Sequence, residues 1–266
     1  MKQLYLIFLF VRVLFSASES SDHAVCGNRP LVVDFRGSRV VGGKNSEPGN
    51  WPWMVSIQEH SEDGEYYWWR LVFGANQLSN KEINTQIQTI QEKFEHEKYY
   101  PELEQNDIAL LRLNQPIVFD EYTQPACLPA EQAVLSKMAD CYVAGWGAPD
   151  ETSIKPSDIL HGVPVNFIPV EGCNKPNWYN GAVGNYNLCA GYEQGTFDTC
   201  QGDSGGPLMC KRRKANFYTV VGITSWGSGC GQKQRPGVYT STQYYLKWIF
   251  EHISDNTKPK SKNYKK

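Results

Sequence analysis

The sequence lacks an excess of charge of either sign. Lysine and arginine number 26 and the acidic residues 28, which gives a formal net charge of −2. A balance this close to zero argues against a surface that attracts nucleic acid or an anionic membrane as a whole. No nucleic-acid partner is therefore expected.

Long hydrophobic runs are also missing after the first residues, where a membrane span would need roughly 18–20 apolar positions. Residues 1–18 combine Lys2, an apolar stretch from Leu4 to Phe10 and the small residues Ser16-Ala17-Ser18, a pattern typical of a secretory signal peptide. Arg12 interrupts the stretch and argues against the alternative, a retained anchor. We expect secretion or delivery to a secretory vesicle, and no membrane span.

Motifs for metals and cofactors are absent. Without Cys-x2-Cys or histidine pairs at ligand spacing, we expect no metal and no cofactor. The sequence contains no Asn-x-Ser/Thr site for N-glycosylation. The eight cysteines of an exported chain instead indicate disulfides, although spacing alone does not choose their pairing. They are Cys26, Cys127, Cys141, Cys173, Cys189, Cys200, Cys210 and Cys230.

Glycine (23), proline (15) and tyrosine (15) favour short strands joined by turns over a helical bundle. Antiparallel barrels or a sandwich suit this spacing, and 266 residues fit one large unit or two halves. Seven runs read as strands: Met54–Gln58, Arg70–Phe73, Ile108–Leu113, Tyr142–Ala144, Pro207–Cys210, Tyr218–Ser225 and Gly237–Thr240.

One helix is predicted near the C-terminus, with Ser241 or Thr242 as its cap. Residues at helical spacing are Tyr245, Trp248, Ile249, His252 and Ile253, and His252 is interpreted as a packing residue. Residues 255–266 form a polar, lysine-rich tail that we expect to be disordered.

A serine flanked by glycines stands in the run Gln201-Gly202-Asp203-Ser204-Gly205-Gly206-Pro207. Glycine tolerates unusual dihedrals and close approach of a substrate. A serine hydroxyl becomes a strong nucleophile once a neighbouring base takes its proton. Ser204 is the candidate nucleophile, but no histidine lies in a recognisable base-bearing segment. The histidines are His23, His60, His96, His161 and His252.

Six ordered motifs carry a family resemblance: Arg39-Val40-Val41-Gly42-Gly43, Asn106-Asp107-Ile108-Ala109-Leu110-Leu111, Gly145-Trp146-Gly147, Asp198 to Pro207, Ser225-Trp226-Gly227 and Pro236-Gly237-Val238-Tyr239. Across residues 40–253 the chain resembles the trypsin-like (chymotrypsin-fold) serine endopeptidases. This implies an all-β fold of two packed antiparallel β-barrels with a C-terminal helix. Trp51–Ser56, Trp69–Ala75 and Val221–Gly227 are most similar to the acrosin branch, which implies an acrosomal location.

The resemblance assigns roles by position. Ser204 matches the nucleophile, and the N–H groups of Gly202 and Ser204 match the oxyanion hole, which stabilises charge in the transition state. Asp107 matches the aspartate that orients the base.

Substrate-binding roles follow from the same resemblance. Asp198 matches the floor of the specificity pocket, Gly227 and Gly237 match its walls, and Ser225 belongs to the same substrate-binding group. A carboxylate at the floor pairs with Arg or Lys, so protein or peptide substrates cleaved after these residues are implied, along with inhibitors that occupy the same site.

Activation and disulfides are implied as well. Arg39-Val40 resembles a zymogen cleavage site, whose freed Val40 amine pairs with Asp203, because a buried carboxylate needs a partner. The implied pairs are Cys26–Cys127, Cys141–Cys210, Cys173–Cys189 and Cys200–Cys230. The first would hold a light chain, residues 19–39, to the protease domain, residues 40–254, in a monomer of two linked chains.

The family pattern breaks after Gln58. There the family has a hairpin ending in Thr/Ser-Ala-Ala-His-Cys, whereas this chain reaches Trp69 through the short connection 59–68. The base histidine and one disulfide are thus missing together. We expect a truncated first barrel with an open edge and an exposed core, and an Asp107 without its imidazole partner.

Three hypotheses remain open. In the first, the gene encodes an endopeptidase, and this sequence is either a shortened variant of it or an incomplete version that lacks one block. The chain as written would then have strongly impaired turnover. Alternatively, it is a secreted pseudoprotease that acts by binding, for which the basic run Lys211-Arg212-Arg213-Lys214 suggests a sulfated polyanion as ligand. The third is a protease that uses His60 as its base.

Overall fold

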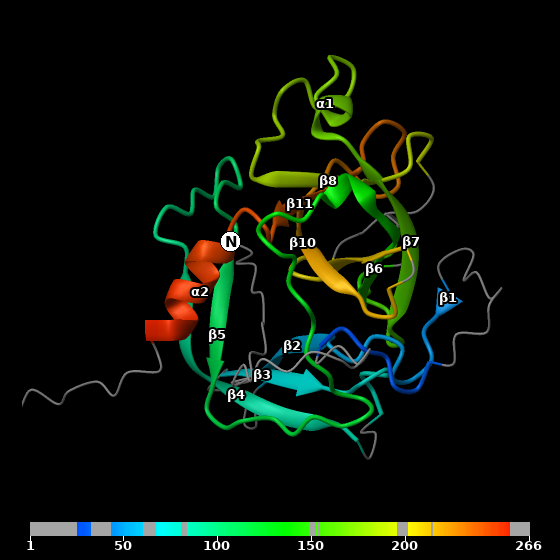
Figure 1. The fold of residues 1–266 in the computed structure, drawn as a ribbon. Helices are drawn as coiled ribbons and strands as arrows, with labels where there is room; N and C mark the ends of the chain where they lie inside the picture. The colour runs from blue at the N-terminus through cyan, green and yellow to red at the C-terminus, as the bar shows by residue number, and fades with distance from the viewer. Residues whose placement is uncertain are drawn as a thin grey trace, which may run out of the picture.

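The computed structural model describes residues 26–32, 44–60, 68–80, 84–148, 153, 155–195, 202–213 and 215–255. This part of the chain is mostly β, with a four-stranded sheet, a larger closed barrel and a helix near the C-terminus (Figure 1). The predicted all-β class and C-terminal helix are confirmed.

The first half is an antiparallel sheet in the order β2-β3-β4-β5. Its strands are β2 (Val55–His60), β3 (Trp68–Phe73), β4 (Gln86–Glu95) and β5 (Ala109–Leu113). Strand β2 pairs with β3 directly, with Ile57 opposite Leu71. Because β2 and β5 are the end strands among the described residues, this sheet is open, as the missing hairpin predicts.

The core of this sheet is covered, however. Leu71 and Phe73 on β3 are 0% and 1% exposed, and Leu111 on β5 packs with them. Ile117 and the partly buried Phe119, which follow β5, complete the cluster. The expected exposed core was therefore wrong for these residues, because the segment after β5 folds over the apolar face.

The second half is a closed barrel. The order β7-β6-β9-β10-β11-β8 returns to its start through a β7–β8 pairing, and the short β1 (Lys44–Asn45) adds to β7. Buried residues of several strands, among them Val143, Leu208 and Val221, fill its core. The strands are β6 (Met138–Gly145), β7 (His161–Ile168), β8 (Asn187–Gly191), β9 (Pro207–Arg212), β10 (Thr219–Trp226) and β11 (Gly237–Ser241).

The C-terminal helix α2 (Leu246–Asp255) joins the two halves and lies beside β5 in Figure 1. Just before it, Ser241 Oγ accepts a hydrogen bond from the N–H of Tyr244 at 3.3 Å, near the predicted cap. Tyr245, Trp248 and Ile249 bury themselves in one cluster with Ile108 and Leu110 from the first half and Ile223 from the barrel. The other helices are single turns, η1 (Leu135–Lys137) and α1 (Val170–Cys173).

Three disulfides have the pairing that the resemblance implied: Cys26–Cys127, Cys141–Cys210 and Cys173–Cys189. Cys230 is also disulfide-bonded, and its expected partner Cys200 lies outside the described residues. In the described ranges, none of the helices has the length and apolar composition required to cross a membrane.

Candidate active site

Asp107 lies just before β5, in a position fixed by the second half of the molecule. Its side chain is buried, with 4% of the residue exposed. The Ser225 hydroxyl, near the end of β10, donates a hydrogen bond to Asp107 Oδ2 at 2.6 Å. From β11, Thr240 Oγ1 donates to the backbone carbonyl of Asp107 at 2.9 Å. Two strands of the barrel thus hold a residue of the first half in place.

The surroundings of Asp107 disfavour its charged form. Burial raises the pKa of this carboxyl group from 3.8 to about 6, the hydrogen bond from Ser225 opposes the rise, and the negative charge of Glu104 adds to it. Removal from water destabilises a carboxylate unless a positive partner compensates. Among the described side chains, none supplies Asp107 with the positive charge that a protonated imidazole provides in a working triad.

Ser204 lies in an exposed turn. Hydrogen bonds attach this turn to β10, the strand whose Ser225 also binds Asp107. The N–H of Gly205 donates to the carbonyl of Thr224 at 2.9 Å, and the N–H of Thr224 donates to the carbonyl of Gly206 at 2.8 Å. Since Thr224 adjoins Ser225, the serine turn and Asp107 are anchored at neighbouring positions of β10. Gly202 and Gly205 have φ values of 99° and 81°, in the left-handed region that favours glycine.

Asp203 packs against the Gly145-Trp146-Gly147 segment. The N–H of Gly147 donates to Asp203 Oδ1 at 2.8 Å. A Cβ atom on Gly145 or Gly147 would overlap the Asp203 carboxylate, so both glycines make room for it. The motif thus sets the position of the acid next to Ser204. Arg39 and Val40, the expected activation residues, lie outside the described residues.

The expected substrate pocket is described in part. Gly227 is exposed directly after β10, and a Cβ placed there would meet only Gly229 O, at an ordinary contact distance of 3.9 Å. Gly237 is buried at the start of β11. Asp198, the expected floor, lies outside the described residues. The pocket roles of Asp198, Ser225, Gly227 and Gly237 stay predictions.

Three histidines with described side chains are occupied elsewhere. His161 lies 2.8 Å from Asn45 Oδ1, and His252 contacts the Trp248 carbonyl at 2.9 Å. His96 Nδ1 accepts the Lys98 N–H at 3.2 Å, and burial lowers the pKa of His96. None of the three contacts Asp107 or Ser204.

His60 is the last residue of β2 and is paired with Trp68 in the register of the hairpin, whereas the sequence suggested a loop position. Its strand continues beyond the predicted end at Gln58 because the short connection brings β2 and β3 together as neighbours. The side chain of His60 lies outside the described part of the structure. Its role as a base therefore stays a hypothesis.

The hydrogen bond between Ser225 and Asp107 was not anticipated. The two residues are 118 positions apart, and Ser225 was assigned only to substrate binding. The motif Ser225-Trp226-Gly227 was the available signal, but spacing cannot show which carboxylate its serine reaches. Within the described ranges, no group of His, Cys, Asp and Glu side chains is arranged to hold a metal ion.

A comparison with protein families agrees with this architecture. The family model described as Trypsin matches residues 62–249, more than half of the chain. The match begins within the short connection after β2, where the expected hairpin is missing. With a closed barrel, an open four-stranded sheet and a glycine-flanked serine turn fixed to the strand that holds Asp107, the chain belongs to the trypsin family of serine proteases.

Proposed function

We propose that the chain is a secreted trypsin-family protein of Arg/Lys-directed, acrosin-like ancestry whose turnover is strongly impaired. The positions of Ser204 and Asp107 in the family motifs support the protease ancestry, and that of Asp198 supports the specificity for Arg and Lys. Activation by cleavage after Arg39, with the Val40 amine pairing with Asp203, is part of the same proposal. In this form the nucleophile and the oxyanion donors are present, and the general base is missing.

The observation that carries the proposal is the environment of Asp107. The aspartate accepts a hydrogen bond from Ser225, and no described histidine side chain contacts it. In a Ser-His-Asp triad, the imidazole between the two other residues takes the proton of the serine. Loss of that base lowers turnover by on the order of 10⁴–10⁶ and leaves the contributions of binding and the oxyanion hole.

The test is labelling of Ser204 by a fluorophosphonate probe, with and without added imidazole. We expect slow labelling that free imidazole accelerates, because the solute supplies the missing base. The Ser204→Ala variant should stay unlabelled under both conditions. Fast labelling without imidazole would contradict the impaired-enzyme proposal. An Asp198→Asn variant, assayed on matched Arg and Gln peptides, tests the bond specificity separately.

Peptide mapping of the natural protein distinguishes a true variant from an incomplete gene reading. If the short connection exists in the mature protein, a tryptic digest contains a peptide that runs from the β1 region through β2 directly to Arg70. Detection of the uninterrupted Asn45–Arg70 peptide as the only form would rule out an incomplete reading. The impaired-enzyme proposal then applies to the mature protein itself.

A second candidate function is binding of a sulfated polyanion by a pseudoprotease. Arg212 and Arg213 are exposed at the end of β9. Lys211 is less available, because its Nζ lies 3.8 Å from Asp140 and over the ring of Tyr218. Salt-dependent retention on a sulfated matrix, abolished when residues 211–214 are neutralised, would support this function. Retention that survives neutralisation would contradict it.

A further inference from the structure

A shallow cavity of about 390 Å³, open to the surface, lies beyond the proposed substrate wall, between two loops of the closed barrel. One loop connects β10 to β11 and contributes Ser228, Gly229 and residues 232–235, and the other follows α1 and contributes Asn177. Ser228 directly follows Gly227, and consecutive Cα atoms are about 3.8 Å apart. The cavity therefore begins one residue beyond the proposed wall position.

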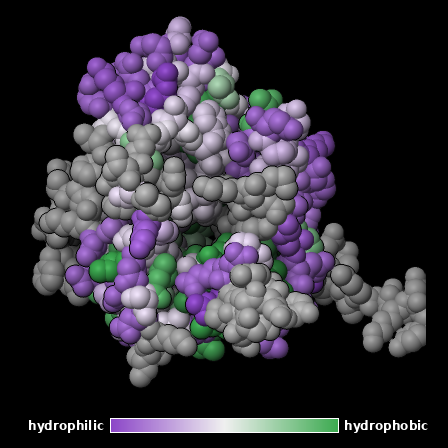
Figure 2. All heavy atoms as spheres, turned by 180° about the vertical axis from the view of Figure 1, so that it is seen from behind, coloured by the Kyte–Doolittle hydropathy of each residue, from purple (hydrophilic) through white to green (hydrophobic). Residues whose placement is uncertain are grey.

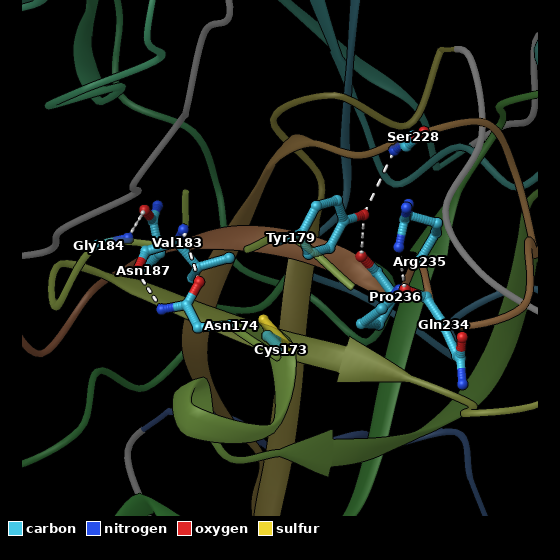
Figure 3. Close-up of a disulfide and its surroundings, with 11 residues drawn as sticks. Cys173, Asn174, Tyr179, Val183, Gly184, Asn187, Ser228, Gln234, Arg235 and Pro236 are labelled. Carbon is cyan, nitrogen blue, oxygen red and sulfur yellow. Dashed lines mark hydrogen bonds between the residues drawn. A yellow bond between two sulfur atoms is a disulfide. The ribbon is translucent and has the colours of Figure 1, made fainter. Parts of the chain in front are cut away.

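The two loops are linked by several hydrogen bonds, some of which Figure 3 shows. The Tyr179 hydroxyl donates to the carbonyl of Pro236 at 2.7 Å and accepts from the N–H of Ser228 at 3.4 Å. Arg235 Nη1 donates to the carbonyl of Asn177 at 2.8 Å. These bonds restrain the loop conformation, and restraint of a binding site lowers the entropic cost of binding.

The described lining of the cavity carries a positive charge. Lys233 and Arg235 line it, and none of the described lining residues is acidic. The described partners of Arg235 are neutral: the carbonyls of Asn177 and Gln234 and the ring of Tyr179, 5.6 Å from the guanidinium. Neither cation forms an ion pair with a described side chain.

One described acidic residue, Glu193, lies on a neighbouring segment. The carbonyl of Glu193 accepts the N–H of Gln234 at 3.0 Å, but the exposed Glu193 side chain does not line the cavity. The hydrophilic end of the molecule seen at the top of Figure 2 corresponds to the end that carries α1 in Figure 1. The surroundings of the cavity thus suit a charged ligand better than an apolar one.

We propose that this cavity is a subsite for an acidic side chain of a bound peptide, close to the Arg or Lys that enters the substrate pocket. A guanidinium binds a carboxylate through two parallel hydrogen bonds, and the ammonium of Lys233 adds a second positive charge. The volume suits one side chain or a short segment, whereas a sulfated polymer needs an extended surface. This inference rests on the proposed function for its peptide ligand.

The experiment measures binding of four fluorescent peptides to the full chain by anisotropy. The peptides carry either Arg or Gln at one position, and either Glu or Gln at the positions two and three residues away on both sides. This design separates the contribution of the Arg from that of the acids. Binding requires no turnover, so the missing base does not affect the readout.

We expect the Glu peptides to bind about tenfold tighter than their Gln counterparts, which corresponds to about 1.4 kcal/mol. The gain should disappear in a Lys233→Gln, Arg235→Gln double variant and shrink in Lys233→Gln, an exposed substitution that leaves the loop contacts intact. Lys175→Gln is the control. Its exposed lysine lies over Trp178 on the loop after α1, outside the lining of the cavity, and the gain should persist.

Each outcome bears on one of the two proposals. The subsite is overturned if the wild type binds the Glu peptides no more tightly than the Gln peptides. It is also overturned if the double variant keeps the higher affinity for the Glu peptides. Tighter binding of a short sulfated oligosaccharide of equal charge, lost in the double variant, also overturns it in favour of a glycan ligand. A gain from Glu without any gain from Arg supports the subsite and contradicts the proposed Arg/Lys specificity.

Discussion

At the scale of single residues, Asp107 gives the clearest prediction. Its pKa of about 6 lies above the usual 3.8, so the folded state holds a proton that the unfolded state has released between these values. The contribution of Asp107 to folding stability should therefore fall as pH rises from about 4 to 6 and level off above. One pKa unit corresponds to about 1.4 kcal/mol, so the loss is on the order of 2–3 kcal/mol.

Asp107→Asn replaces the titrating carboxyl group with a neutral amide. The pH dependence of folding stability between about pH 4 and 6 should therefore become flatter. The readouts are thermal unfolding at pH 4.5 and 7.5 and a ¹³C-carboxyl NMR titration of Asp107 in the wild type. Glu102→Gln, a substitution of an exposed acid close by in the chain, serves as the matched control and should leave the pH dependence unchanged. A carboxyl midpoint near 4, or parallel pH profiles for wild type and Asp107→Asn, would contradict the prediction.

Gly145 gives a second prediction at this scale. An alanine Cβ at this position would overlap the Asp203 carboxylate, so Gly145→Ala should displace Asp203 and the adjoining Ser204 turn. Overpacking of this kind costs about 1–3 kcal/mol. A fall in melting temperature together with slower imidazole-assisted labelling of Ser204 is expected. Gly181→Ala is the control: a Cβ there meets no atom within 4 Å, although φ is 84°, so only the strain of the turn is added.

Single residues also show what sequence can predict about the site. Ser204 and Asp107 are predicted as site residues because their neighbours form recognisable motifs, and the loss of the base histidine is predicted from the break in the same pattern after Gln58. The bond from Ser225 to Asp107 was not found, because it depends on β10 passing next to the start of β5. Contacts between segments 118 positions apart are determined by the packing of the two halves.

At the scale of secondary structure, Glu97 links α2 to the end of β4. Its carboxylate accepts a hydrogen bond from Trp248 Nε1 at 3.2 Å, and its Oε1 lies 3.1 Å from His252 Nε2. His252 Nδ1 also faces an acceptor, the Trp248 carbonyl. Glu97 therefore joins α2 to the segment that follows β4.

We therefore expect Glu97→Gln to destabilise the docked helix by about 1 kcal/mol or less, since the Glu97 side chain is 63% exposed and water screens such pairs. Thermal unfolding of the wild type and the variant at the same pH is the measurement. Glu251→Gln, which alters an exposed i,i+4 pair with Lys247 on the same helix, is the matched control and should lower the melting temperature less, because that pair does not link α2 to another segment.

Elements were predicted well where the apolar pattern was strong and missed where it was diluted. Strand β4 reads QIQTIQEKFE, and its alternation was hidden by polar and charged residues on a half-exposed strand. Strand β7 contains Gly162 and Pro164, which normally argue against a strand. Pro164 is nevertheless opposite Tyr142 on β6, because the barrel as a whole fixes the path of β7.

At the scale of the whole molecule, the closed barrel has more stabilising features than the open four-stranded sheet. The barrel closes on itself and contains Cys141–Cys210 and Cys173–Cys189, while Cys26–Cys127 lies outside the strands of the open sheet. Exposed hydrophobic side chains include Trp69 and Ile87 on the open sheet, both 45% exposed, and Val118 after it, 70% exposed. Hydrophobic residues are also visible at the lower end of the molecule in Figure 2. Open edge strands are the positions where a sheet begins to unfold or to pair with another chain.

Hydrogen exchange measured by mass spectrometry should reveal this inequality. We expect amides of β9 and β10, inside the closed barrel, to exchange at least about 30-fold more slowly than those of β2 and β5, a difference of about 2 kcal/mol in opening free energy. The central strands β3 and β4 are the internal control. If they exchange as fast as β2 and β5, the sheet opens as one unit; if more slowly, its edges fray. Equal protection of β2, β5, β9 and β10 would show that the remaining contacts replace the missing hairpin completely.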